Sequence, residues 1–168
     1  MTRQRARSAD RGPIAKERLT PDDAERLDLG RPADVRALVC AGFCTHYKPE
    51  AVEEWHCGGL GLVARLREQA AARNADEVAA FDRALRDAVA SRELLDFAAD
   101  ALLEPAICAT CAFLLEAGCD HRNPDLADDE RLEPCGGYLL LTLLLRTGTL
   151  DAGQVAAAGS SGGEPAGD

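Results

Sequence analysis

The sequence predicts an all-α protein, a small helical bundle that carries two related cysteine-bearing loops. Hydrophobic residues make up 46% of the 168-residue chain, enough for a buried core, whereas aromatic residues make up only 4%. Ala and Leu, which favour helices, are abundant, and few segments have the composition of strands. Apolar residues recur at helical spacing between residues that typically cap or break helices. These observations together favour helices packed around one core.

Capping residues and helix breakers divide the chain into successive helices. Thr20 is expected to cap the first helix, with Pro21 in its first turn, and Gly30 with Pro32 ends it. Asn74 and Thr149 are the expected caps of two later helices. The run at 136–148 is apolar on every face, so that helix should be buried. The helices after the first are predicted at residues 33–44, 58–74, 75–104 with a break near Ser91, 105–118, 136–148 and 149–158.

We expect a single domain between two tails. Residues 19–158 form the predicted helical domain, with half-repeats at about 33–73 and 105–147. Residues 1–18 carry six basic and two acidic residues and are predicted to be a flexible basic arm. Residues 159–168 are rich in Gly and Ser and are predicted to be a disordered tail.

Charge and hydropathy indicate the compartment of the protein and disfavour some binding partners. The net charge of −10 disfavours binding to phosphate backbones, which need clusters of Lys and Arg. The longest apolar run, 138–145, is too short to span a bilayer, and the basic N-terminus precedes no apolar run of a secretory signal. We therefore expect a cytoplasmic protein. Thiols stay reduced there, and seven is an odd number, so the cysteines indicate metal binding rather than a disulfide framework.

Two stretches of the chain repeat the same pattern of cysteine, histidine, proline and glycine. Residues 44–59 read CTHYKPEAVEEWHCGG, and residues 119–137 read CDHRNPDLADDERLEPCGG. Both begin Cys-x-His-x-x-Pro and end Cys-Gly-Gly before a leucine-rich helix. This pattern indicates an internal duplication, in which a pseudo-two-fold arrangement would bring both loops to one side of the bundle.

The cysteines can be divided into metal sites in two ways. In the first, the second half forms a complete four-cysteine site, whereas the three cysteines of the first half need another ligand, for which His46 and His56 are candidates. His121 then serves as a hydrogen-bonding loop residue. In the second, one site made of Cys44, Cys57, Cys119 and Cys135 bridges the halves. We favour separate sites, because the close Cys108–Cys111 pair has no duplicate in the repeat. The predicted cysteine ligands are Cys40, Cys44, Cys57, Cys108, Cys111, Cys119 and Cys135.

The spacing of these cysteines favours an iron–sulfur centre. Structural zinc sites usually take two tight ligand pairs, whereas uneven, widening spacing suits one or two [4Fe–4S] clusters whose corners are reached from separate segments. Zinc remains the alternative metal. A cysteine at a helix start feels the positive end of the helix dipole, which favours the thiolate. The two glycines after it are expected to let backbone N–H groups approach the cluster closely.

The run CATC, followed by GCD and PCGGYLLL, resembles uncharacterised small bacterial cysteine-rich proteins that are regarded as iron–sulfur proteins. This resemblance covers roughly residues 40–145 and implies no particular activity. The predicted function is electron transfer or redox sensing with a protein partner. The alternative is a zinc-stapled interaction module without redox chemistry. No nucleophile with a partner base is visible, so the sequence leans away from an enzyme without excluding one.

Overall fold

The computed structural model describes residues 18–44, 57–92, 102–109, 111–112, 119 and 134–160. Within these ranges the chain forms seven helices and no strand, which confirms the all-α prediction. The helices are α1 (Pro21–Glu25), α2 (Pro32–Phe43), α3 (Gly58–Arg73), α4 (Ala75–Ser91), α5 (Leu103–Cys108), α6 (Gly136–Arg146) and α7 (Ala152–Ser160).

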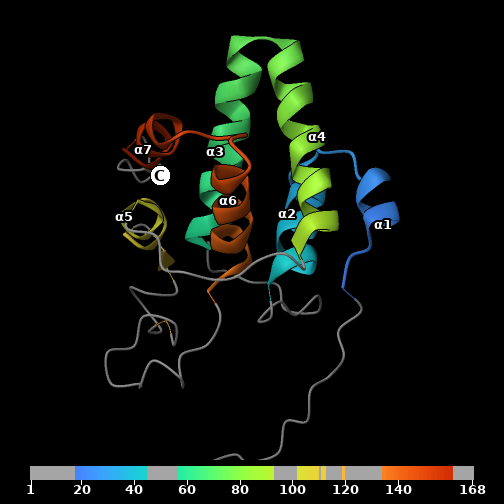
Figure 1. Ribbon diagram of the computed structural model, residues 1–168, viewed down its shortest axis with the longest axis horizontal. Coiled ribbons are helices and arrows are strands. Elements are labelled where there is room, and N and C mark those ends of the chain that lie inside the picture. The colour runs from blue at the N-terminus through green and yellow to red at the C-terminus, as the bar shows by residue number, and fades with distance from the viewer. Residues whose placement is uncertain are drawn as a thin grey trace, which may run out of the picture.

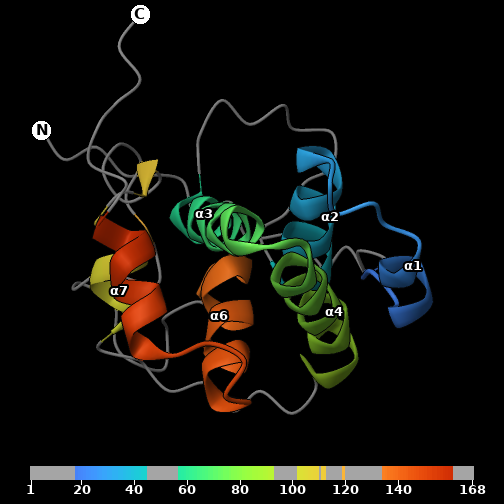
Figure 2. The ribbon, with the colours of Figure 1, turned by 90° about the horizontal axis from the view of Figure 1, so that it is seen from above.

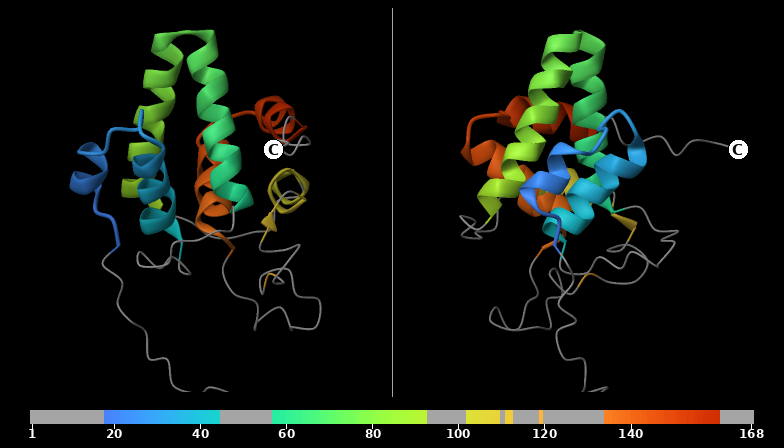
Figure 3. Two further views of the ribbon diagram at one scale, coloured as in Figure 1. Left: turned by 180° about the vertical axis from the view of Figure 1, so that it is seen from behind. Right: turned by 90° about the vertical axis from the view of Figure 1, so that its right-hand side faces the viewer.

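Four helices form the body of the bundle. The long helices α3 and α4 make an antiparallel hairpin that turns at Asn74, and α6 packs against the lower half of this hairpin in the view of Figure 1. Helix α2 packs against α6, α3 and α4, as the view from above shows (Figure 2). The short helices lie outside this body, α1 against α4 and both α5 and α7 against α3 (Figure 3). As a result, α3 and α6 begin at the end of the bundle where α2 stops.

The core is centred on α6. Every residue from Gly136 to Leu144 is buried, which confirms that the run predicted to be apolar on all faces is an internal helix. The surrounding helices contribute one apolar face each, and Leu62, Leu85 and Leu38 from α3, α4 and α2 are fully buried against it. Thr142 is a polar residue among these buried apolar ones, and its hydroxyl donates to the Tyr138 carbonyl within the same helix.

Side-chain caps fix the starts of α1, α4 and α7. Thr20 forms a reciprocal capping box with Asp23, and Asn74 accepts from the Glu77 N–H at 2.8 Å, so both predicted caps are confirmed. The prediction that Thr149 caps the last helix is wrong. Asp151 accepts from the Gln154 N–H at 2.9 Å instead, and the Thr149 hydroxyl is hydrogen bonded to Thr147.

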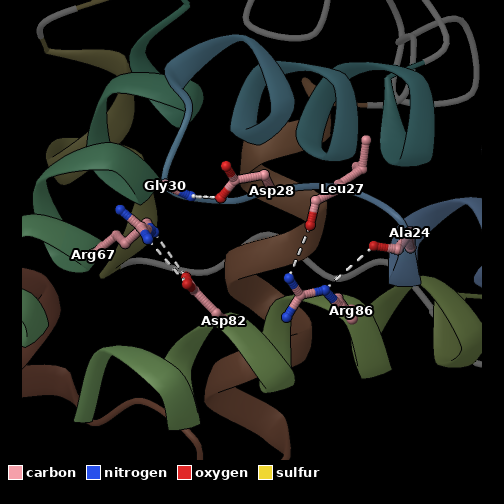
Figure 4. Close-up of polar contacts among 7 residues, drawn as sticks. All are labelled: Ala24, Leu27, Asp28, Gly30, Arg67, Asp82 and Arg86. Carbon is pink, nitrogen blue, oxygen red and sulfur yellow. Dashed lines mark hydrogen bonds and ion pairs between the residues drawn. The ribbon is translucent and has the colours of Figure 1, made fainter. Parts of the chain in front are cut away.

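Half-buried arginines join the two helices of the hairpin to each other and attach α1 to α4 (Figure 4). Arg67 on α3 makes two hydrogen bonds to the Asp82 carboxylate on α4, at 2.7 and 2.9 Å. Arg86 on α4 donates to the carbonyls of Ala24 and Leu27, which fixes α1 and the segment after it against α4. The hairpin is therefore the frame to which the smaller elements are attached.

Several predictions fall partly or wholly outside the described residues. Residues 1–17 and 161–168, from the two expected tails, lie there, as do 93–101 and most of 110–118. Helix α7 extends to Ser160, so the tail predicted to start at residue 159 includes two helical residues. Among the helices of the described part, none is long and apolar enough to cross a membrane.

Candidate metal centre

Most of the cysteines lie at or near the ends of helices. Cys40 lies in the last turn of α2 and Cys44 is its C-cap, whose N–H donates to the Cys40 carbonyl at 3.0 Å. Cys108 ends α5, and the Cys111 N–H donates to its carbonyl at 3.2 Å. These two pairs therefore stand at equivalent places, at the C-terminal ends of two helices.

The other two helix-end cysteines lie at N-termini. Cys57 is the N-cap of α3 and Cys135 is the N-cap of α6, both with extended backbone dihedrals. Neither makes a side-chain capping hydrogen bond. The prediction that each Cys-Gly-Gly begins a helix is confirmed.

The glycines that follow these two cysteines let α3 and α6 touch backbone to backbone. A Cβ atom built on Gly137 would lie 2.5 Å from the Cα of Gly59 and 2.3 Å from its carbonyl carbon. A Cβ on Gly59 would lie 2.8 Å from the Cα of Gly137. Only glycine at both positions permits this contact, because any side chain would push the helices apart. The contact brings the starts of the two helices, and hence Cys57 and Cys135, side by side.

The remaining glycine of each pair rests on a cysteine-bearing helix of the other half. A Cβ on Gly58 would lie 2.2 Å from the Ile107 carbonyl oxygen and 3.0 Å from the Cβ of Cys111. A Cβ on Gly136 would lie 2.6 Å from the Val39 carbonyl oxygen and 2.9 Å from the Cβ of Cys44. The two contacts correspond when the halves are exchanged, which is what a pseudo-two-fold axis through the α3–α6 contact would produce.

The thiols meet across this axis. The side chains of Cys57 and Cys135 are hydrogen bonded to each other, and this bond, together with burial, raises the pKa of the Cys135 thiol well above its ordinary value. Cys111 also acts electrostatically on Cys135. On the other side, Cys57 and Cys40 both line a cleft of about 580 Å³ between α2 and α3. We call the six helix-end thiols the cysteine layer: Cys40, Cys44, Cys57, Cys108, Cys111 and Cys135.

All seven cysteines fall in the described part of the chain, and none is in a disulfide. Cys111 is buried and the others are half-buried. Within the described ranges, no three His, Cys, Asp or Glu side chains form a group that could hold one metal ion. His46, His56 and His121 lie outside those ranges. Cys119 is described, but its neighbours on either side are not.

The structure changes two parts of the sequence interpretation. The Cys108–Cys111 pair does have a counterpart, Cys40 with Cys44, so the reason for favouring two separate sites is lost. The signal was present in the sequence, because each pair follows a buried β-branched residue, Val39 or Ile107, but the unequal spacing within the pairs hid it.

The Gly-Gly pairs also have a role that sequence reasoning missed. They were expected to let N–H groups approach a cluster. In the structure the space beside Gly59 and Gly137 is filled by the backbone of the opposite helix, so these glycines are required for helix packing.

Comparison with known proteins gave no relative. No family model matches the chain, and neither does any curated protein or solved structure.

Proposed function

We propose that the cysteine layer binds an iron–sulfur cluster, of the [4Fe–4S] type, and that the protein transfers electrons or senses redox state together with a partner protein. The observation that carries the proposal is the contact between Cys57 and Cys135 at the starts of α3 and α6. Within its own half, Cys57 lines the same cleft as Cys40, and Cys135 is affected electrostatically by Cys111.

The donor set fits such a cluster. Thiolates are the soft ligands of iron–sulfur clusters, and the four corners of a cubane can be reached from separate segments of a chain. Here the thiols come from the ends of α2, α3, α5 and α6, which lie far apart in the sequence. Cys57 and Cys135 at the pseudo-two-fold axis are the central ligands of the proposed centre. Two further ligands, which complete the four of one shared cluster, come from the pairs at the ends of α2 and α5.

The two helix starts support anionic ligands at Cys57 and Cys135. Helices α3 and α6 point their N-termini, which carry partial positive charge, at these two cysteines, whereas α2 and α5 bring their C-terminal ends to the layer. A cluster ligated by four thiolates carries net negative charge, which these termini stabilise. When bound, the cluster supplies one-electron chemistry, and the chain holds it and sets its polarity through burial and the two helix dipoles.

The surface charge suits a protein partner. A net charge of −10 favours docking to a basic patch, and this complementarity raises the rate of association more than the affinity. Electron transfer between such partners requires only that the centre lie close to the docking surface. Five of the six thiols of the cysteine layer are half-buried, which supports a centre near the surface.

Anaerobic purification tests the proposal. Iron, acid-labile sulfide and zinc are measured per chain, and the reduced protein is examined by electron paramagnetic resonance. We expect a brown protein with iron and sulfide in equal amounts, and a spectrum of a reduced cluster. A colourless protein with stoichiometric zinc would instead establish the zinc-stapled module and contradict the proposal.

Single Cys-to-Ser variants locate the ligands. Cys57→Ser and Cys135→Ser are expected to lose most of the iron, because both lie at the axis of the proposed centre. Cys119→Ser is the comparison variant, since Cys119 lies outside the cysteine layer. If Cys119→Ser loses its iron while Cys57→Ser retains full iron, the ligands are instead the second-half cysteines predicted from the sequence.

A further inference from the structure

We propose that Cys57 and Cys135 form a reversible disulfide that links the starts of α3 and α6 when no metal is bound. This site goes beyond the proposed metal function and does not depend on it. It is carried by the contact of two reduced cysteines on different helices, held together by the glycine crossing immediately after them.

The backbone holds the two cysteines in place. Gly59 and Gly137 touch, with a Cβ on Gly137 falling 2.5 Å from the Cα of Gly59, and each glycine is two residues beyond its cysteine. The Sγ of Cys135 lies 3.0 Å from the position that a Cβ of Gly59 would occupy, so this sulfur reaches over to the first turn of α3. The hydrogen bond between the Cys57 and Cys135 side chains completes the juxtaposition.

The two thiols differ in access. Cys57 lines the 580 Å³ cleft between α2 and α3, beside Leu60 and Gly61, whereas Cys135 packs against the hydrophobic core. A small oxidant therefore meets Cys57 first.

The oxidant is a low-molecular-weight disulfide, and the reaction is two successive exchanges. The Cys57 thiolate attacks one sulfur of the oxidant, a mixed disulfide forms, and one small thiol leaves after taking a proton. The Cys135 thiol loses its proton and attacks the Cys57 Sγ, which releases the second small thiol. The cysteine pair gives up two electrons, and the small disulfide is reduced to two thiols.

The disulfide and a metal centre exclude each other, because the same two sulfurs cannot serve both. Oxidation would therefore lock the bundle without metal, and reduction would reopen the site. Disulfide formation is for this reason examined on the full-length chain after metal removal under reducing conditions, with helix content checked by circular dichroism.

Oxidised glutathione is the probe, and peptide mapping is the readout. Combined cleavage after Arg, Lys and Glu releases residues 55–65, whose single cysteine is Cys57, and trypsin releases 132–146, whose single cysteine is Cys135. We expect these two peptides joined by a disulfide, and the number of titratable thiols to fall by two. The link should disappear on addition of dithiothreitol.

Three variants make the result specific. Cys57→Ser and Cys135→Ser should each abolish the link. Cys40→Ser is the matched control, because Cys40 lines the same cleft, and this variant should keep the link in full. The proposal is overturned if wild-type protein accumulates glutathione on Cys57 without the 55–65 to 132–146 link, or if Cys57 joins Cys40 or Cys44 instead.

The same preparation separates this inference from the metal proposal. If the isolated protein carries a cluster, the loaded form should resist the link until metal is removed. If it carries no metal, the peptide map of the isolated protein decides the inference alone.

Discussion

The two ends of the α3–α4 hairpin are built on different principles. At the turn between these helices, Asn74 caps α4 with its side-chain oxygen, and Arg73 pairs with Glu77 across the turn. At the opposite end α3 and α6 begin with Cys57 and Cys135, which make no side-chain capping bond. Sulfur is a weak hydrogen-bond acceptor, so a cysteine is a poor substitute for Ser, Thr, Asn or Asp at an N-cap.

This difference shows where each end obtains its stability. The turn is stabilised locally, by caps and ion pairs between residues close in sequence. The cysteine end depends on a long-range contact, the crossing of Gly59 with Gly137, and places thiols where other helix starts have oxygen acceptors. Sulfur adds little to the stability of these helix starts. The cysteines there are therefore better explained by the metal-binding and redox chemistry of thiols than by capping.

The largest effect is expected from a side chain at the glycine crossing. Gly137→Val would place its Cβ 2.3 Å from the Gly59 carbonyl carbon, and no flexible side chain can yield there. The free energy of unfolding should fall by about 3 kcal/mol, measured by urea denaturation. Gly61→Ala is the matched control, because the nearest atom to its Cβ would be the Arg65 guanidinium at 3.5 Å. This control should gain roughly 0.5–1 kcal/mol, since Ala favours a helix interior more than Gly. Equal effects of the two substitutions would show that the crossing is not a tight contact.

The half-buried ion pair of the hairpin should matter next. Arg67→Ala removes two hydrogen bonds to Asp82, whose side chain is only 15% exposed, and leaves that carboxylate without this partner. We expect a loss of about 1–2 kcal/mol, between the values for exposed and fully buried pairs. Arg26→Ala breaks an exposed pair with Asp23 and should cost less than about 0.5 kcal/mol. Thermal or urea unfolding of both variants tests this order, and a larger loss for Arg26→Ala would reverse it.

Alkaline pH should weaken the cysteine end of the metal-free, reduced protein. The hydrogen bond with Cys57 and burial raise the pKa of Cys135 in the folded state, so the unfolded chain releases this proton at lower pH. The stability contributed by the protonated thiol is complete below the ordinary thiol value, near pH 9, and is lost as pH rises from there toward the folded-state value. The slope contributed by one group is at most about 1.4 kcal/mol per pH unit. Denaturation of wild type and Cys135→Ser from pH 8 to about 10.5 isolates the contribution of this thiol to the free energy of unfolding. If that free energy falls with pH equally in both proteins, Cys135 makes no such contribution.

The smallest effect is expected at the turn. Asn74→Ala removes the side-chain acceptor for the Glu77 N–H and should cost about 1 kcal/mol, whereas Asn74→Ser should retain most of the stability. Metal content should be unchanged in both variants, because the turn is at the far end of α3 from Cys57. A loss of metal in Asn74→Ala would mean that the two ends are coupled.

The sequence by itself determined the helical class, most helix starts and the buried character of α6, because these follow from local capping, propensity and hydrophobic period. Thr20 and Asn74 cap as predicted, since an N-cap acts within one turn of its own helix. The prediction that Thr149 caps the last helix was wrong because Asp151 provides the cap two residues later. The repeated Cys-Gly-Gly motif was also visible in the sequence, and it correctly predicted two helix starts.

Only the tertiary structure decided how the two halves meet. The crossing of Gly59 with Gly137, the seating of Gly58 on Cys111 and of Gly136 on Cys44, and the pairing of Cys57 with Cys135 all join residues separated by tens of positions. Spacing along a chain carries no information about which copy of a repeat packs against which. That choice depends on the shapes of the helix surfaces, which are complementary only where both backbones lack a side chain.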